Sequence, residues 1–347
     1  MRATIMENDG SVHLAEVPDA AIVHPTDAVV RITASCICGS DLHPYHRGLG
    51  DRASKRAGHE FIGVVEAIGA DVTTISVGDY VIAPFAISDG TCVNCRNGIM
   101  TSCLHGGFWG SDDEQGVLVD GGQGEAARVP QADGTLVKVD REVDDALVPH
   151  LLALSDVMGT GHHAAVTARV GEGSTVVVIG DGAVGLSGVL AAKRLGASRI
   201  VIMSKYAERQ AMATRFGATD IVESRGDEGI AAVIELLGGI GADSVLECVG
   251  SQGSLDQAAG VARPGGVIGF VGAPSGTFPT RPLFSNNLTY TGGVAPVRRY
   301  IPELLAEVLD GTLRPGDVFD STLALADVAA GYQAMDERRA IKVLLKP

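Results

Sequence analysis

The chain has 347 residues, of which 46% are hydrophobic and 20% charged, and its formal net charge is −15. This length suits two domains of ordinary size, and no apolar run of about 18 residues indicates a membrane span. An acidic balance without a basic stripe argues against a nucleic-acid partner and against binding to an anionic membrane. The amino-terminal segment lacks a basic stretch followed by an apolar one, so we expect a cytoplasmic protein without a signal peptide.

The first part of the chain, residues 1–150, is expected to form a β-barrel-type domain with its sites on loops. Short segments rich in β-branched residues are bounded there by Gly, Asp and Pro, a pattern typical of strands. The expected strands are 3–6, 12–17, 28–34, 61–68 and 80–84. Nearly all the cysteines lie in this part, and cysteines in a cytosolic chain of this length indicate metal binding or catalysis rather than disulfides.

A first cluster of metal-ligand residues contains Cys38 and His59. A thiolate and an imidazole from separate loops suit zinc, and a catalytic zinc site has three protein ligands and one open position. Asp156, at the start of an expected helix, is the candidate third ligand. Taken singly, His59 could be an ordinary polar residue and Asp156 a helix N-cap.

A second cluster lies in the segment SDGTCVNCRNGIMTSC, which contains Asp89, Cys92, Cys95 and Cys103. Four side chains in so short a loop can surround one ion in a closed, structural zinc site. Buried free cysteines are a poor alternative, because the loop is polar and the thiols lie close together.

The segment 176–185, VVVIGDGAVG, predicts a strand, a tight turn and the start of a helix. Its glycines, Gly180, Gly182 and Gly185, suit a turn whose backbone approaches a pyrophosphate and whose helix packs close to the strand. Ala183 and Val184 belong to the same expected coenzyme site, at the helix N-terminus that attracts phosphate. A glycine-rich turn alone is often structural, but the helix 186–195 and a second strand 199–203 complete a βαβ unit.

From residue 151 to 296 strands and helices alternate, which predicts a doubly wound parallel sheet. The expected strands are 176–179, 200–203, 220–222, 244–247 and 267–271, and 208–216 is an expected helix. Val249 and Val271, at the ends of two of these strands, are further expected coenzyme contacts. The tail, with helices 301–310 and 325–335 and a strand 341–345, is expected to return to the first domain.

The end of the second strand of the βαβ unit indicates which coenzyme is bound. An acidic residue there, about twenty residues beyond the last glycine, accepts hydrogen bonds from the ribose 2′-OH and repels a 2′-phosphate. Here Ser204 and Lys205 occupy that place, with Arg209 nearby. A hydroxyl and a cation favour phosphate, so NADP(H) is expected in preference to NAD(H); the alternative is that Lys205 is a solvated lysine at a helix start.

Taken together, these motifs resemble the zinc-dependent alcohol dehydrogenases of the medium-chain dehydrogenase/reductase superfamily. The resemblance extends over nearly the whole chain, through CGSDLH, GHEFIGVV, VGDYV, the cysteine lobe, SDVMGTGHHAA, GDGAVG and ECVG. It implies a GroES-like catalytic domain formed by residues 1–150 and 297–347, and a Rossmann coenzyme domain formed by residues 151–296. It also implies a homodimer or homotetramer and a small-molecule alcohol or carbonyl substrate.

The resemblance assigns roles to the residues of the first cluster. Cys38, His59 and Asp156 match the ligands of the catalytic zinc, and Glu60 matches a carboxylate that lies near the metal. Asp41 matches the partner that fixes the tautomer of the ligand imidazole.

Two further residues match a proton relay: Ser40 matches the hydroxyl that passes the substrate proton outward, and His43 a later station. The chemistry implied is transfer of hydride between an alcohol and a nicotinamide coenzyme. Two alternatives are a zinc-free enone or quinone reductase of the same superfamily and a non-catalytic coenzyme-binding protein. The cysteine lobe and the metal-ligand residues argue against both.

Two positions leave alternatives open. Many relatives have a cysteine where Asp89 stands; a carboxylate oxygen also binds zinc, and His105 is the alternative ligand. Trp109, the only tryptophan, either lines the substrate pocket or serves as a packing residue.

Overall fold

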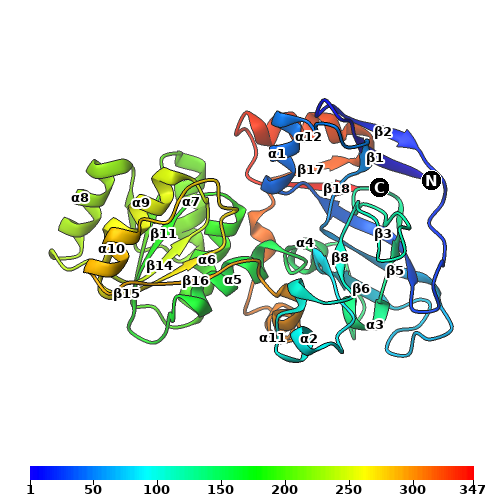
Figure 1. Ribbon diagram of the computed structural model, residues 1–347, viewed down its shortest axis with the longest axis horizontal. Coiled ribbons are helices and arrows are strands. Elements are labelled where there is room, and N and C mark those ends of the chain that lie inside the picture. Colours follow the sequence, from blue (N-terminus) through cyan, green and yellow to red (C-terminus); the bar gives the residue numbers. More distant parts are fainter. The chain divides into compact units, whose positions relative to one another are not determined.

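The computed structural model describes residues 1–347, which form two compact units (Figure 1). Unit 1 comprises Met1–Asp156 and Pro296–Pro347, and unit 2 comprises Val157–Ala295. Both chain termini therefore lie in unit 1. None of the helices is both long enough and apolar enough to cross a bilayer.

Unit 1 is built on a seven-stranded sheet to which both ends of the chain contribute. From edge to edge its strands are β10 (Val137–Lys138), β6 (Tyr80–Ala83), β5 (Phe61–Ile68), β3 (Ala28–Cys36), β18 (Val343–Lys346) and β17 (Ser321–Ala324), and β9 (Ala126–Val129) also pairs with β3. β18 runs antiparallel to β3, with Leu344 opposite Cys36. The last strand of the chain thus pairs with β3, the earliest strand of the same sheet.

Smaller elements surround this sheet. A three-stranded sheet has the order β2 (Val12–Glu16), β1 (Arg2–Met6), β4 (Lys55–Arg56), and β7 (Ala86–Ile87) pairs with β8 (Gly107–Phe108). The α-helices of unit 1 are α1 (Leu42–Arg47), α2 (Val93–Arg96), α3 (Ala132–Thr135), α4 (Val148–Ala153), α11 (Val297–Asp310) and α12 (Val328–Asp336). The 3-10 helices are η1 (Gly39–Asp41), η2 (Met100–Ser102), η3 (Pro315–Val318) and η4 (Leu325–Asp327).

Two apolar clusters hold unit 1 together. One lies on the sheet and includes Phe61 and Trp109, whose rings meet edge to face with centroids 4.9 Å apart. The other joins α12 to the loop after β3, where Tyr332 and Ile37 are fully buried. Burying each large side chain contributes about 1.5–3 kcal/mol. The carboxyl-terminal helix is therefore fixed against the loop that begins at Ile37.

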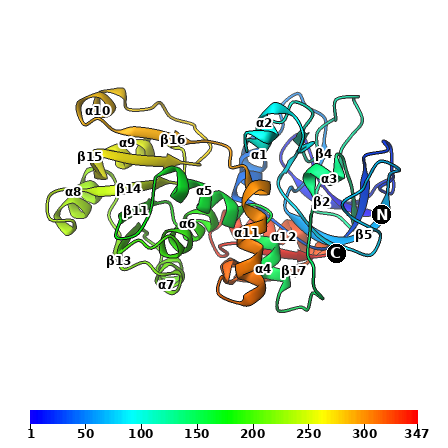
Figure 2. The same ribbon diagram turned by 90° about the horizontal axis from the view of Figure 1, so that it is seen from below.

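Unit 2 contains a six-stranded parallel sheet. Its order is β13 (Asp220–Val222), β12 (Arg199–Met203), β11 (Thr175–Ile179), β14 (Ala242–Glu247), β15 (Ala262–Phe270) and β16 (Thr289–Gly292). The helices are α5 (Val157–Thr167), α6 (Ala183–Arg194), α7 (Ala207–Phe216), α8 (Gly226–Leu236), α9 (Gln252–Val261) and α10 (Thr280–Ser285). Figure 2 shows α9 and α10 on one side of the sheet and α6 and α7 on the other, which confirms the doubly wound α/β fold.

Several elements differ from the sequence prediction: β4, β7, β8, β9 and β10 were not predicted, and α11 begins at Val297 rather than at residue 301. The final strand begins at Val343 rather than at residue 341, because the Ile341 and Lys342 amides donate hydrogen bonds to the Asp320 carboxylate instead of to a strand. β15 begins at Ala262, earlier than expected, and β16 was not predicted. The short polar segment TYTG of β16 carries little strand signal of its own.

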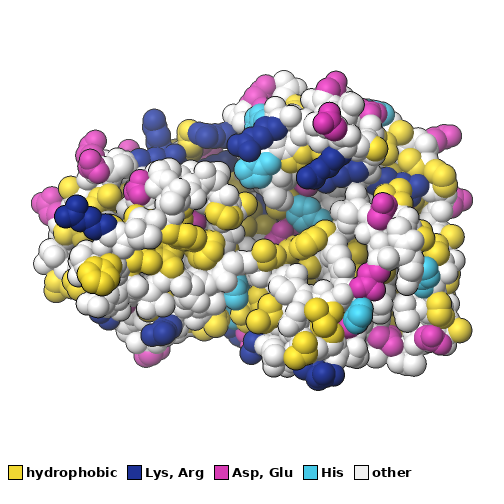
Figure 3. All heavy atoms as spheres, viewed as in Figure 1, with side chains coloured by type: hydrophobic (Ala, Val, Ile, Leu, Met, Phe, Trp, Pro, Cys, Tyr) yellow, Lys and Arg dark blue, Asp and Glu magenta, His cyan; other side chains and the backbone are white.

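On the face shown in Figure 3, many Lys and Arg side chains gather in the upper part of the view, whereas Asp and Glu side chains are scattered.

Candidate active site and metal centres

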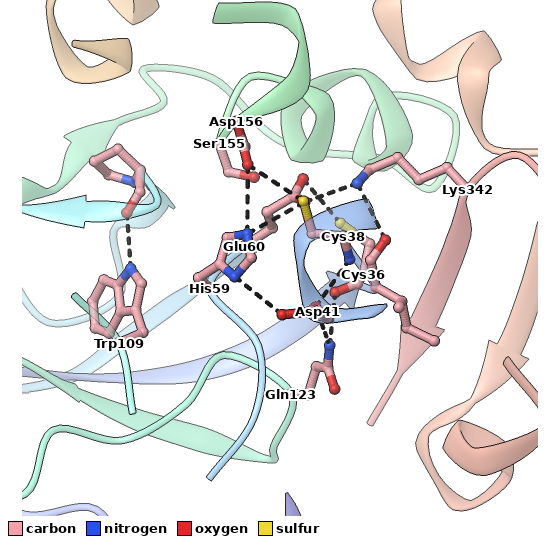
Figure 4. Close-up of polar contacts among 12 residues, drawn as sticks. Cys36, Cys38, Asp41, His59, Glu60, Trp109, Gln123, Ser155, Asp156 and Lys342 are labelled. Atoms are coloured by element: carbon pink, nitrogen blue, oxygen red, sulfur yellow. Dashed lines mark hydrogen bonds and ion pairs between the residues drawn. The ribbon is translucent and has the colours of Figure 1, made fainter. Parts of the chain in front are cut away.

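Four potential metal ligands of unit 1 converge where the inner strands β3 and β5 of its main sheet meet end to start (Figure 4). Cys38 follows β3, and His59 and Glu60 precede β5. Because β3 and β5 are antiparallel neighbours, with Ser35 opposite Phe61, the end of one strand meets the start of the other. Asp156 comes from the segment after α4, which is tied to the same region by a 3.0 Å hydrogen bond from the Phe85 amide to the Ser155 carbonyl.

The distances within this cluster suit a tetrahedral ion. Cys38 Sγ lies 3.7 Å from Asp156 Oδ2, and His59 Nε2 lies 3.5 Å from the same oxygen. Zinc bonds of about 2.0–2.3 Å place tetrahedral ligand atoms about 3.3–3.8 Å apart. Glu60 Oε1 lies farther from His59 Nε2, at 4.0 Å. Cys38, His59 and Asp156 therefore fit zinc as a set of three ligands, with Glu60 beside them.

The electrostatics of the cluster also favour a cation. Burial raises the pKa of the Cys38 thiol, and the neighbouring Glu60 and Asp156 charges raise it further. Burial disfavours the charged imidazolium of His59, but the Asp41 and Cys38 charges outweigh that effect and raise its pKa well above the ordinary value. Protons therefore neutralise this concentration of negative charge when no metal does so, and a divalent cation would replace them.

A chain of hydrogen bonds orients the imidazole of His59. Asp41 Oδ1 lies 3.4 Å from His59 Nδ1, while Asp41 Oδ2 accepts hydrogen bonds from the Cys38 amide at 3.0 Å and from Gln123 Nε2 at 3.2 Å. The buried Tyr332 hydroxyl donates to Gln123 Oε1 at 3.1 Å. Gln123 and Tyr332 were not found from the sequence, because they are distant from the motifs and carry no metal-ligand signal.

Glycine is required beside this chain. A Cβ atom on Gly58, which has φ +90°, would lie 2.4 Å from Gln123 Cγ. Gly58 thus leaves the space that the Gln123 side chain needs to reach Asp41.

Glu60 is held by a buried ion pair. Lys342 Nζ lies 2.8 Å from Glu60 Oε1 and donates to the Ile37 carbonyl at 3.3 Å. The Cys36 thiol donates to Glu60 Oε2 at 3.2 Å. The Lys342 and Glu60 side chains are 1% and 0% exposed, so neither charge is screened by water. Burial opposes the charge of Lys342, but the Cys36 and Glu60 charges raise its pKa well above the ordinary value.

The two residues of the expected proton relay lie on the surface. Ser40 is in η1, two residues after Cys38, and His43 is in α1; both are exposed. The structure therefore places a hydroxyl and an imidazole on the outer side of the loop that carries Cys38.

Trp109 is a packing residue in this structure. It is 5% exposed, stacks edge to face on Phe61 and donates from Nε1 to the Pro84 carbonyl at 2.9 Å. The aromatic ring beside the metal-ligand cluster is instead Phe85, with its centroid 6.4 Å from that of His59, and the exposed Phe108 stacks on Phe85. Of the two roles left open for Trp109, the structure shows packing; sequence reasoning missed Phe85 and Phe108.

The second cluster lies within the cysteine lobe. The ligand atoms of Asp89, Cys92, Cys95 and Cys103 all lie within 4.8 Å of one another, and the Cys92 and Cys103 sulfurs are 3.9 Å apart. That sulfur–sulfur distance is close to the roughly 3.8 Å that a shared tetrahedral zinc ion requires. His105, the alternative ligand, lies outside the set and faces Glu114, with 3.2 Å between Nδ1 and Oε1.

Backbone amides prepare the lobe for anionic ligands. The Leu104 amide donates to Cys92 Sγ, and this contact together with others from the backbone lowers the pKa of Cys92 to about 7. Burial opposes ionisation of Asp89, but hydrogen bonds from the Cys92 and Thr91 amides outweigh it and lower the pKa of Asp89 to about 2. Burial raises the pKa of Cys95. The residues present fit a closed zinc site.

The glycine turn of unit 2 has the geometry expected of a dinucleotide site. Gly180 has φ +109°, and a Cβ atom on Gly185 would lie 1.8 Å from the Gly180 carbonyl oxygen. Gly182 caps α6 without a side-chain hydrogen bond, so the first amides of α6, at Ala183 and Val184, are open to a phosphate.

The other expected coenzyme residues lie at the carboxyl edge of the same sheet. Val249 follows β14 and is exposed, and Val271 follows β15. At the end of β12, Ser204 is buried and Lys205 is exposed. The Ser204 hydroxyl donates to Asp181 Oδ2 at 2.9 Å. Asp181, the residue between the first two glycines of the turn, was overlooked in the sequence; a charged residue at that position was the available signal.

Comparisons with known proteins agree with this architecture. The family model described as "Alcohol dehydrogenase GroES-like domain" matches residues 24–141, and the one described as "Zinc-binding dehydrogenase" matches residues 183–310. These ranges fall in unit 1 and mostly in unit 2, respectively.

Individual proteins are similar over long stretches. An uncharacterized zinc-type alcohol dehydrogenase-like protein of Bacillus subtilis is 30% identical, with 100% of each chain covered. The NADP-dependent isopropanol dehydrogenase of Clostridium beijerinckii is 34% identical, over 70% of this chain and 68% of its own. The structure of the alcohol dehydrogenase TADH from Thermus sp. ATN1 superposes with a TM-score of 0.90 at 35% identity, covering 100% of this chain and 99% of that one.

Proposed function

Because this chain belongs to the zinc-dependent alcohol dehydrogenase family of the medium-chain dehydrogenase/reductase superfamily, we propose that it transfers hydride between an alcohol, or the matching aldehyde or ketone, and a nicotinamide coenzyme. The observation that carries the proposal is the tetrahedral spacing of Cys38, His59 and Asp156. When bound there, zinc supplies a Lewis acid that acidifies an alcohol hydroxyl or polarises a carbonyl.

The residues around the ligands orient this site and move the proton. Asp41 holds the imidazole of His59 in one tautomer, and Gln123 in turn fixes Asp41 by donating a hydrogen bond to its carboxylate. The ion pair with Lys342 holds the Glu60 carboxylate in place beside the ligands. Ser40 takes the proton of the alcohol at its hydroxyl oxygen and releases its own proton towards solvent, with His43 as the next acceptor.

The substrate is a small molecule that one aromatic wall can accommodate. Phe85 lies against His59, and the exposed ring of Phe108 extends that wall. Apolar contact with this surface would orient the carbon that gives or receives hydride. The coenzyme supplies the hydride donor or acceptor, while the protein supplies orientation and electrostatics.

NADP(H) is the preferred coenzyme in this proposal. Ser204 and Lys205 end the second strand, where a carboxylate would repel a 2′-phosphate, and Arg209 lies close by. The similarity to an NADP-dependent isopropanol dehydrogenase supports the same preference. A structural zinc in the cysteine lobe and a homodimer or homotetramer complete the proposal.

The test is coenzyme absorbance during incubation with a panel of alcohols, polyols and sugars, each with NADP and with NAD. We expect one class to reduce the coenzyme, faster with NADP, and the reaction to be lost after chelation. Cys38→Ser should abolish turnover and leave coenzyme binding intact. Full activity of Cys38→Ser, or well-folded active protein without zinc, would contradict the zinc mechanism.

A further inference from the structure

Charged residues gather where three neighbouring strands of unit 2 end. The strands β13, β12 and β11 are adjacent and parallel, so their carboxyl ends lie at one edge of the sheet. Asp181 follows β11, Lys205 follows β12, and Arg225 follows β13 immediately before α8. Ligands of open α/β sheets bind outside this edge.

Asp181 is the centre of these contacts. Its Oδ2 accepts a hydrogen bond from the Ser204 hydroxyl at 2.9 Å and lies 4.0 Å from Arg225 Nη2. Arg209 Nη1 lies 3.3 Å from Asp181 Oδ1 and 3.2 Å from the Asp181 carbonyl oxygen. The Asp181 side chain is only 8% exposed. Both carboxylate oxygens are therefore already engaged by donors from the protein.

The cations around Asp181 differ in how much they are exposed. The Arg209 side chain is 14% exposed and is anchored by its two contacts with Asp181. The Arg225 side chain is 50% exposed, and Lys205 is exposed as well. Arg225 and Lys205 can thus contact a ligand, whereas the largely buried Arg209 contacts Asp181.

Two exposed cations at this edge can pair with an anion. Arg209 and Arg225 contact the carboxylate of Asp181, and Lys205 follows the adjacent strand. Two other carboxylates of this region accept hydrogen bonds from neutral side chains: Glu223 from Gln210 at 3.1 Å and Glu228 from Ser224 at 3.1 Å. A phosphate monoester could therefore pair with Arg225 through charge-assisted hydrogen bonds.

We propose that Arg225 binds the 2′-phosphate of NADP(H) together with Ser204 and Lys205, and that Asp181 is a positioning residue that fixes Ser204 and Arg209 for this purpose. The inference rests on the proposed dehydrogenase function and deepens it, because it places one specificity determinant after β13 and another in the glycine turn. The competing role for Asp181 is that of an acceptor for the ribose 2′-OH, which would favour NAD(H). Burial argues against that role, because the Asp181 side chain is only 8% exposed.

Calorimetric titration of the full chain with adenosine 2′,5′-bisphosphate and with adenosine 5′-monophosphate tests the inference without turnover. We expect the bisphosphate to bind more tightly to the unaltered protein. Arg225→Gln should weaken bisphosphate binding about tenfold, as the loss of one charge-assisted hydrogen bond does, and change monophosphate binding less than about twofold. The matched control is Arg281→Gln, an exposed arginine of α10 near the opposite edge of the sheet, which should change neither.

Asp181→Asn separates the two roles of the carboxylate. If Asp181 positions the phosphate ligands, the variant binds the bisphosphate several-fold more weakly and the monophosphate as before. If the variant binds the bisphosphate more tightly and the monophosphate more weakly, Asp181 selects NAD(H) and the inference is wrong. Equal binding of both nucleotides by unaltered protein would overturn the inference and leave the dehydrogenase proposal intact, whereas binding of neither would refute coenzyme binding itself.

Discussion

The two candidate metal centres of unit 1 differ in how their ligands are brought together. In the cysteine lobe all four ligands fall within residues 89–103, and short turns such as α2 and η2 place them. In the other centre, Cys38, His59 and Asp156 come from loops far apart in the sequence. A local centre needs little more than its own loop, while a non-local one depends on the whole unit.

The surroundings of the two centres differ in the same way. Backbone amides support the sulfurs and the carboxylate of the lobe. Side chains from distant elements support the other centre: Gln123, Tyr332 from α12 and Lys342 beside β18. Substitution of these distant side chains should therefore weaken metal binding by Cys38, His59 and Asp156 and leave metal binding in the lobe unchanged.

The largest expected effect is at the third ligand. Asp156→Ala should remove one zinc per chain and reduce turnover by a factor of about a thousand or more, because the oxygen that faces both Cys38 and His59 is lost. Zinc analysis, initial rates and coenzyme binding measure the effect. Asp140→Ala, on a side chain that is 83% exposed, is the matched control. Normal zinc content in Asp156→Ala would remove this residue from the ligand set.

The next effect concerns the buried ion pair. Lys342→Met should lower the free energy of unfolding by about 3–5 kcal/mol, because it leaves the fully buried carboxylate of Glu60 without its cation. Denaturant unfolding measures the change. Lys346→Met, at the exposed end of the adjoining strand β18, should be nearly neutral. A loss below about 1 kcal/mol for Lys342→Met would mean that the ion pair with Glu60 contributes little to stability.

A smaller effect is expected in the lobe. Asp89→Ala should lose the lobe zinc and melt several degrees earlier, while the zinc bound by Cys38 and the chemistry remain. Zinc content and thermal unfolding test this expectation. Unchanged metal content would show that the three cysteines hold the ion with some other ligand.

The same carboxylate gives the metal-free lobe a pH dependence. Its pKa in the folded protein, about 2, lies below the ordinary value of 3.8, so its contribution to stability is complete above the ordinary value and disappears as the pH falls towards about 2. The difference in stability between Asp89→Asn and unaltered protein, both freed of zinc, should therefore shrink as the pH is lowered from about 5 to about 3. A difference that grows on acidification would contradict the assignment.

The smallest effect is expected at the far end of the hydrogen-bond chain. Tyr332→Phe removes the hydroxyl that holds Gln123, and we expect zinc affinity at the catalytic centre to fall about tenfold through the looser support of Asp41 and His59. Competition with a zinc chelator measures the affinity, with zinc retention by the lobe as the internal control. Equal weakening of both centres would indicate general destabilisation instead.

The carboxyl edge of the sheet in unit 2 shows which contacts a sequence motif does not predict. The glycines and the strand around them indicated a dinucleotide site, because the spacing in the chain itself creates the turn. The contact between Asp181 and Ser204 could not be foreseen, since β11 and β12 become neighbours only in the sheet. Trp109 shows the same limit for side chains: the sequence left open whether it lines a pocket or packs, and only the structure places its ring against Phe61.

The sequence by itself determined what depends on short-range spacing: the βαβ unit and the four candidate ligands of the lobe. The pairing of Cys38 with His59 was predicted from their residue types and from the family resemblance. Only the tertiary structure decided which residues support them. Gln123, Tyr332 and Lys342 act through contacts between elements that are distant along the chain, where burial removes the screening by water. Spacing in the chain records local geometry, whereas the electrostatics of a buried site depends on everything that folding places around it.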